Sequence, residues 1–249
     1  MEPHIVETRS GLEHDHYLQT PDTFARTALP GMSRGTGIVH AGAARGARFT
    51  EYTAEFEAGG TLAPSAVQRF CYVLDGEALL EGRSGMIRRH DRMGAGGYAY
   101  LPAAAAITLR AITAARVVVI EKPRVEADGV RSPGILVGEE SAVAASGLKE
   151  DDAIQVRALL PEDAAFDFAV NIVTYEPGAF LPAVGMHVME HGQMMLAGDG
   201  VVRLGGKWYP VTAGDFIWIA PYCPQWFGAF GKTPSRWLQY TDWNRRPLD

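Results

Sequence analysis

The feature that most constrains the fold of this chain is an internal repeat of strand-like segments. Three pairs of segments match in the same order along the 249 residues: 49–60 with 168–179, 72–82 with 194–206, and 96–108 with 214–226. Gly198 lies 122 residues after Gly76. Gly214 lies 118 residues after Gly96, so the loop between the two glycines of each copy is four residues shorter in the second copy. Because one set of turns and strands occurs twice, the sequence predicts one structural unit written twice in tandem.

Each copy consists of short segments of strand type. The segment FTEYTAEFEAGG alternates apolar and polar residues and ends in a Gly-Gly turn, and Asp75–Gly76 has the chemistry of a hairpin turn. Such strands, separated by glycine and proline turns, predict an all-β protein of sandwich or barrel type. We expect an N-terminal arm, a first barrel, a connecting segment with one strand at Ile154–Leu159, and a second barrel with a C-terminal tail, at residues 1–35, 36–122, 123–160 and 161–249.

The composition argues against several kinds of partner. The net charge is −6 and no basic run is present, which argues against nucleic acid. No apolar stretch is long enough for a membrane-spanning helix, and the N-terminus shows no apolar region of a secretory signal. Cys71 and Cys223 form no CxxC pair, so they are interpreted as buried free thiols of a reduced, cytoplasmic protein. The triplet His14–Asp15–His16 is interpreted as a solvated polar turn.

The candidate chemistry is concentrated between residues 177 and 226. His187 and His191 lie four residues apart there, and on a strand their side chains would share one face while Glu190 faces the other way. About 13 Å of extended strand would separate them, so a bend, permitted by Gly185, is needed to bring both to one ion. A helix is the alternative, because it also places the pair on one face, but the prolines and glycines of this stretch argue against it.

The stretch resembles the two motifs of the cupin superfamily, whose fold is a small β-barrel, also called a double-stranded β-helix or jelly roll. In words, the first motif is Gly, five residues, His-x-His, three or four residues, Glu, six residues, Gly, and the second ends in Pro-x-Gly, two residues and His. The four ligand positions of these motifs fall in the second copy on Gly185, His187, His191 and Gln225. In the first copy they fall on residues that suit no divalent cation, namely Ala63, Ser65, Arg69 and Ile107. The resemblance therefore implies a bicupin, two tandem cupin barrels, of which the first binds no metal.

One cupin family is similar over most of the chain, above all in the segments HVMEH, PQW and GKTPSRWLQYTDWNR. It is the (S)-ureidoglycine aminohydrolase family, which converts (S)-ureidoglycine and water to (S)-ureidoglycolate and ammonia with manganese, in purine and allantoin breakdown. The resemblance implies that His187, His191 and Gln225 ligate Mn²⁺. It also implies a small ureido or amino acid substrate and a homo-oligomer, with no nucleic acid or membrane partner. Gln193, which shares a strand face with the two histidines, is expected to line the substrate pocket. So are three residues of one strand parity: Trp237, Gln239 and Thr241.

Four positions depart from the pattern of this family. Its Glu ligand falls on Gly185, its two substrate tyrosines on Val202 and Trp237, and its substrate lysine on Thr241. A carboxylate brings charge to a Mn²⁺ site that imidazole and amide do not, so its loss weakens the site. Two histidines that merely hydrogen-bond inside a polar barrel are the alternative to a metal site. Two functions stay open: a metal-dependent hydrolase of C–N bonds, and a diverged bicupin that binds a small molecule without this chemistry. The sequence identifies no catalytic residue.

Overall fold

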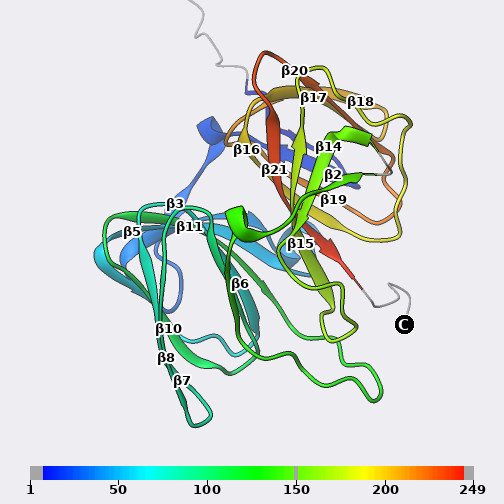
Figure 1. The fold of residues 1–249 in the computed structure, drawn as a ribbon. Coiled ribbons are helices and arrows are strands. Elements are labelled where there is room, and N and C mark those ends of the chain that lie inside the picture. The colour runs from blue at the N-terminus through cyan, green and yellow to red at the C-terminus, as the bar shows by residue number, and fades with distance from the viewer. Residues whose placement is uncertain (1–7, 149–150, 244–249) are drawn as a thin grey trace, which may run out of the picture. The chain divides into compact units, whose positions relative to one another are not determined.

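The computed structural model describes residues 8–148 and 151–243, and nearly all of their regular structure is strand (Figure 1). The helical elements of these residues are three short 3-10 segments, η1 (Pro21–Thr23), η2 (Ala43–Arg45) and η3 (Glu140–Ala142). Within the same described ranges, no helix is long and apolar enough to cross a bilayer. The chain forms two compact units, each built from three segments. The first-barrel unit comprises Ala25–Ala145, Arg157–Asn171 and Asp242–Asp249, and the second-barrel unit comprises Met1–Phe24, Ser146–Val156 and Ile172–Thr241.

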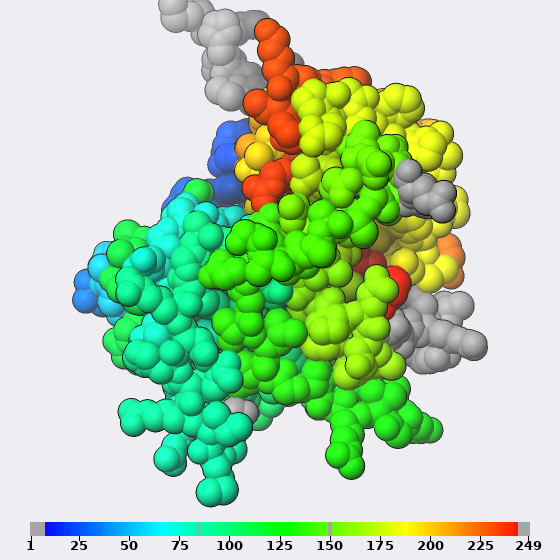
Figure 2. Space-filling model, in the orientation of Figure 1, coloured from blue at the N-terminus to red at the C-terminus, as the bar shows by residue number. Residues whose placement is uncertain are grey.

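One ten-stranded antiparallel sheet forms the first-barrel unit, with β3 and β4 paired at the side of β5 and the remaining strands in the order β12-β9-β6-β11-β5-β10-β7-β8. Its strands are β3 (Arg26–Thr27), β4 (Met32–Ala41), β5 (Thr50–Leu62), β6 (Gln68–Asp75), β7 (Ala78–Ser84), β8 (Ile87–Met93), β9 (Gly97–Leu101), β10 (Ala106–Ala111), β11 (Ala115–Lys122) and β12 (Leu136–Glu139). Alternate residues of β5 and β11, such as Tyr52 and Val119, pack into one apolar core, as the period of two requires. The hairpin of β7 and β8 extends from this unit (Figure 2). Met86, in its turn, is 98% exposed.

The ligand positions of the first copy are engaged in packing and in an ion pair. Ile107 is fully buried in the apolar core. The buried Arg69 guanidinium contacts the Glu121 carboxylate at 2.7 Å and donates to the carbonyl oxygen of Ala63 at 2.8 Å. A cation at this position would face the fixed positive charge of Arg69.

An eight-stranded and a three-stranded antiparallel sheet surround the second core, in the orders β1-β2-β19-β16-β21-β15-β14-β13 and β18-β17-β20. Their strands are β1 (Gly11–Leu12), β2 (His16–Gln19), β13 (Ser146–Leu148), β14 (Asp151–Ala158), β15 (Phe168–Tyr175), β16 (His191–Ala197), β17 (Asp199–Leu204), β18 (Lys207–Thr212), β19 (Phe216–Ile219), β20 (Gln225–Phe230) and β21 (Ser235–Asp242). The strand expected at 154–159 is β14, which begins three residues earlier. The core includes Met195, Ile217, Phe227 and Trp237.

The repeat is confirmed by glycines that adopt the same conformation in both copies. Gly76 and Gly198 have φ angles of 76° and 80°, and Gly96 and Gly214 have 83° and 94°. A Cβ on Gly76 would lie 2.2 Å from the carbonyl oxygen of Ala114, and one on Gly198 would lie 2.6 Å from that of Pro234. Glycine is required at both turns because no other residue tolerates the positive φ and the close backbone approach. The predicted all-β fold of two tandem barrels is therefore confirmed.

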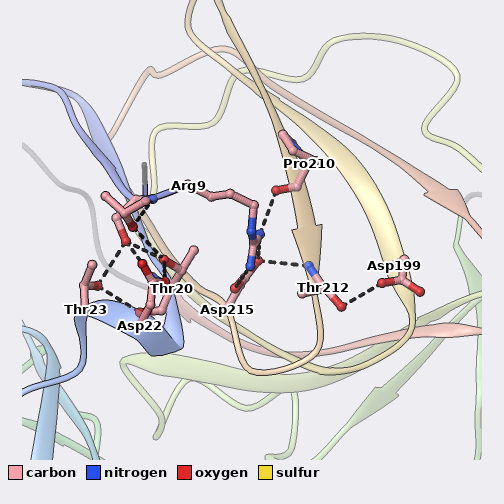
Figure 3. A network of polar contacts seen from close by, with 10 residues as sticks. Arg9, Thr20, Asp22, Thr23, Asp199, Pro210, Thr212 and Asp215 are labelled. Carbon is pink, nitrogen blue, oxygen red and sulfur yellow. Dashed lines mark hydrogen bonds and ion pairs between the residues drawn. The ribbon is translucent and has the colours of Figure 1, made fainter. Parts of the chain in front are cut away.

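The N-terminal segment joins the second-barrel unit through a strand and an ion pair. Strand β2 pairs with β19, and the indole of Trp218 stacks on Tyr17 with ring centroids 5.4 Å apart. The Arg9 guanidinium reaches both carboxylate oxygens of the fully buried Asp215, at 2.5 and 2.9 Å (Figure 3). The backbone N–H of Thr212 donates to the same carboxylate at 2.9 Å. The charge of Asp215 is thus balanced by a residue more than two hundred positions earlier in the chain.

Candidate functional site

The candidate site lies where three segments of the second barrel meet. His191 is the first residue of β16, and its register partners are Ile219 of β19 and Thr241 of β21. Gln225 begins β20, and its backbone N–H and carbonyl exchange two hydrogen bonds of 2.8 Å with Gly185. The carbonyl oxygen of His187 accepts the N–H of Tyr222 at 2.7 Å. Backbone pairing from remote segments therefore fixes the loop that carries His187.

Three of the expected ligands converge in this region. His187 Nδ1 lies 3.1 Å from His191 Nε2 and 3.2 Å from Gln225 Nε2. The two imidazole rings are nearly perpendicular, at 73°, with centroids 5.2 Å apart. His187 Nδ1 thus lies within hydrogen-bond distance of both the His191 ring and the Gln225 amide.

The route to this convergence differs from the shared strand face that the spacing predicts. Gly185 makes an isolated bridge, and the regular strand begins only at His191, so His187 lies in the preceding loop. Neither the continuous strand nor the alternative helix is present here. Glu190, whose parity predicts an outward side chain, is 1% exposed and accepts the indole N–H of Trp218 at 3.1 Å. The outward assignment of Glu190 is therefore wrong, because the chain bends before the strand starts.

His191 is held as a neutral, oriented imidazole. Burial and the neighbouring His187 lower the pKa of His191 to about 3, so the ring is uncharged at neutral pH. Its Nδ1 forms a hydrogen bond of 3.0 Å with the hydroxyl of Thr241, which leaves Nε2 pointing at His187. A metal-binding histidine needs a neutral ring and an oxygen partner for its second nitrogen, and His191 has both.

The spacing of these groups fits a metal ion. Bonds of about 2.1 Å at right angles place neighbouring ligand atoms about 3.0 Å apart, close to the separations of 3.1 and 3.2 Å in this site. Only the oxygen of an amide can ligate a cation, so Gln225 would turn its amide by half a turn to present Oε1. Gly185 lies beside the same ring: a Cβ there would be 3.3 Å from His187 Nε2. The position expected to match the family's carboxylate therefore borders the His187 ring on its Nε2 side.

The four residues expected to line a pocket fall on the two central strands. Gln193 pairs with Gln239, and Met195 pairs with Trp237. Gln193 Nε2 donates to Gln239 Oε1 at 3.3 Å, and Gln239 Nε2 donates to the Thr241 hydroxyl at 3.1 Å. Side-chain hydrogen bonds thus connect Thr241 to Gln239 and Gln239 to Gln193. Trp237 is 3% exposed and packs edge-on against Phe227 in the apolar core, with ring centroids 5.3 Å apart.

A second group of side chains was missed by reasoning from the sequence. His16 is 2% exposed, so the solvated turn expected for residues 14–16 is wrong at this position. Its ring lies beside Asp15 and Cys223, and the ligand atoms of the three all fall within 4.8 Å of one another. Cys71 and Cys223 are free and buried, as expected. The signal for His16 was the apolar pair that follows it, Tyr17–Leu18, which marks a buried strand.

Fold and site together define the class of this protein. The cupin domain family matches residues 171–240, which contain the site and the second core. A putative glyoxylate-induced protein from Pseudomonas aeruginosa has a solved structure with a TM-score of 0.86 and 28% identity, covering 96% of this chain and 93% of that one. Bacillus subtilis oxalate decarboxylase, described with Mn(II) centres, shares the fold with a TM-score of 0.71 at 12% identity, over 96% of this chain and 79% of that one. The chain is a bicupin.

Two relatives narrow the class to a family. The chain is 36% identical to a probable (S)-ureidoglycine aminohydrolase of Oryza sativa subsp. japonica, over 97% of this chain and 77% of that protein. It is 35% identical to the (S)-ureidoglycine aminohydrolase of Arabidopsis thaliana, over 97% of this chain and 80% of that protein. The chain belongs to the (S)-ureidoglycine aminohydrolase family of hydrolases.

Proposed function

We propose that this bicupin is a metal-dependent hydrolase of the ureidoglycine aminohydrolase type, with the ion, Mn²⁺ in the first instance, held by His187, His191 and Gln225. The observation that carries the proposal is the convergence of these three side chains at separations of 3.1 and 3.2 Å. The names of the rice and Arabidopsis relatives supply the reaction. Such a reaction hydrolyses the C–N bond between the α-carbon and the amino group of ureidoglycine, yields ureidoglycolate and ammonia, and belongs to purine breakdown.

The residues of the chain have separate parts in this proposal. A bound divalent cation supplies a Lewis acid that orients a small substrate and polarises the reacting group. Thr241 holds the ring of His191 in one orientation, and neutral His191 would offer the ion its Nε2, which faces His187 Nδ1. The amides of Gln193 and Gln239 offer both donors and acceptors, which suits the N–H and C=O groups of a ureido compound. Their mutual hydrogen bond of 3.3 Å is long enough to be exchanged for bonds to a ligand.

One set of observations favours a second candidate function, the binding of a small molecule without hydrolysis. The family's carboxylate ligand is replaced by Gly185, and its substrate lysine is replaced by Thr241. Val202, at the position of a family tyrosine, is 3% exposed within the apolar core. These substitutions remove a negative charge from the ion and a positive charge from the substrate. A site of this kind favours ligands without a free carboxylate.

Ammonia release tests the proposal. Purified protein, loaded with Mn²⁺ after removal of other metals by a chelator, is mixed with (S)-ureidoglycine, and ammonia is measured against the rate without protein. We expect release above that background in the wild type and its loss in His191→Ala, whereas His90→Ala, at an exposed histidine of β8, keeps the wild-type rate. Equal rates with and without folded, metal-loaded protein would reject the hydrolase. Retention of metal in that inactive protein would then favour the binding function.

A further inference from the structure

The group formed by Asp15, His16 and Cys223 contains three different metal-binding side chains around one point. His16 Nδ1 lies 2.8 Å from Asp15 Oδ1 and 3.8 Å from Cys223 Sγ. His16 and Cys223 are each 2% exposed, whereas a quarter of the Asp15 side chain reaches solvent. Among the described residues, this is the one group of three or more His, Cys, Asp or Glu side chains close enough to share an ion.

These separations approach those of a tetrahedral zinc site. With bonds of about 2.0 Å to nitrogen and oxygen and about 2.3 Å to sulfur, tetrahedral angles place nitrogen and sulfur about 3.5 Å apart and nitrogen and oxygen about 3.3 Å apart. The separations of 3.8 and 2.8 Å in the structure differ from these by a few tenths of an ångström, in opposite senses. Small rotations of the Asp15 and Cys223 side chains are therefore enough to admit the ion.

The surroundings of His16 also fit a metal-binding histidine. Its Nε2 forms a hydrogen bond of 3.0 Å with the Tyr209 hydroxyl, so the ring presents Nδ1 to Asp15 and Cys223. A partner on the second nitrogen is the usual companion of a metal-bound imidazole. The exposed part of Asp15 gives an ion, and a water molecule as its fourth ligand, a path from solvent.

We propose that Asp15, His16 and Cys223 form a second metal site, which binds Zn²⁺ with water as its fourth ligand. The site fastens the start of β2 to the segment before β20, because Asp15 and His16 come from the first and Cys223 from the second. Cys223 lies two residues before Gln225, so the ion also steadies the backbone that presents Gln225. The role proposed for this ion is to link these two segments. It does not depend on the proposed hydrolase activity.

A reactive-cysteine reading of the same group fails on its geometry. Asp15 and Cys223 both approach the same nitrogen of His16, Nδ1, whereas a nucleophile and an orienting carboxylate need opposite nitrogens of the ring. Burial, followed by the charge of Asp15, also raises the pKa of the Cys223 thiol to about 11. The thiol is therefore protonated in the metal-free protein, and a poor nucleophile.

Cobalt is the probe that distinguishes this site from the histidine pair, because only a thiolate ligand gives the intense sulfur-to-cobalt absorption band in the near ultraviolet. Reduced, metal-free protein carrying His187→Ala and His191→Ala is titrated with Co²⁺, which Zn²⁺ then displaces. We expect a saturable band at one equivalent, lost in Cys223→Ser and retained in Cys71→Ser. Asp15→Ala, a change at a partly exposed residue, should weaken Co²⁺ binding at least tenfold.

The outcomes of the titration are decisive in either direction. Absence of the band in the folded parent overturns the site without any further variant, and so does a band that persists in Cys223→Ser. If Cys223→Ser does not fold, an unchanged Co²⁺ affinity in Asp15→Ala overturns the proposed ligand set. None of these readouts uses ammonia release, so the titration tests this metal site independently of the proposed hydrolase activity.

Discussion

The hydroxyl of Thr241 lies 3.0 Å from Nδ1 of His191, across a register pair that joins β16 and β21. The position at which the family carries a substrate lysine therefore serves here to orient a candidate ligand. We predict that Thr241→Val lowers the affinity for Mn²⁺ about tenfold to a hundredfold, because His191 loses its partner. Thr241→Ser keeps the hydroxyl and is the matched control. Calorimetric titration with Mn²⁺ measures both, and equal affinities for Val and Ser would remove Thr241 from the site.

Gly185→Glu is expected to raise the affinity for Mn²⁺. The new side chain would begin 3.3 Å from His187 Nε2, whereas Nδ1 of that ring faces His191 and Gln225, so the carboxylate has to extend past the ring edge to reach the ion. An anionic oxygen adds charge that the neutral set of His187, His191 and Gln225 lacks. In Gly185→Gln the new side chain has nearly the shape of glutamate but no charge, so the affinity for Mn²⁺ should rise much less. If Glu and Gln bind Mn²⁺ equally well in folded protein, residue 185 does not face the ion.

Arg9→Ala is expected to destabilise the second-barrel unit by about 1–3 kcal/mol, since the buried Asp215 loses a charged partner while keeping the Thr212 N–H. The comparison is Arg26→Ala, which removes a more exposed pair with Glu55 and should cost clearly less, because solvent screens that pair. Urea denaturation followed by tryptophan fluorescence measures the difference. Equal losses of unfolding free energy in Arg9→Ala and Arg26→Ala would show that the Arg9–Asp215 pair contributes no more than an exposed ion pair.

Glu51→Gln is expected to stabilise the protein increasingly as the pH rises from 5 to 8. Burial raises the pKa of Glu51 from 4.5 to about 8, and neither carboxylate oxygen has a hydrogen-bond partner in the described part of the chain. Below the unfolded pKa both states are protonated. Between the two pKa values only the unfolded state ionises, so stability falls with rising pH by up to about 1.4 kcal/mol per unit.

The measurement for Glu51 is the free energy of unfolding across this pH range, in wild type and variant. Glu57→Gln, at a carboxylate whose side chain is 74% exposed, controls for the general change in charge. A difference between wild type and Glu51→Gln that stays constant from pH 5 to 8 would show that Glu51 is already ionised in the folded state.

The sequence predicts the parts of the fold that local chemistry decides. Glycines such as Gly76 and Gly198 mark turns through their own backbone conformation, and alternation marks strands such as β5 through the period of two. These signals were sufficient for two barrels of one type. The grouping of His187, His191 and Gln225 as one ligand set rests instead on the resemblance to the cupin motifs.

The details that the sequence does not predict depend on remote partners. His187 leaves the strand because Tyr222 and Gln225 bond the loop around it, and no local pattern announces those bonds. Glu190 is buried for the same reason. The bend before His191 turns the Glu190 side chain to the face opposite the one that a continuous strand predicts. His16 belongs to the polar triplet 14–16. Its burial results from the pairing of β2 with β19, which the triplet itself does not indicate.

The pairing of β2 with β19 also has a consequence for the time order of folding. During synthesis β2 emerges about 200 residues before its partner, which at 5–20 residues per second is a delay of about 10–40 s. Throughout that interval Tyr17 and Leu18, both nearly fully buried in the finished protein, have no sheet to join. Contacts of such long sequence separation form late, because the entropy of closing the intervening chain must be met first. One of the earliest strands to be translated is therefore among the last to be folded, and a nascent chain stalled before residue 216 would carry it as an exposed apolar segment for chaperones to bind.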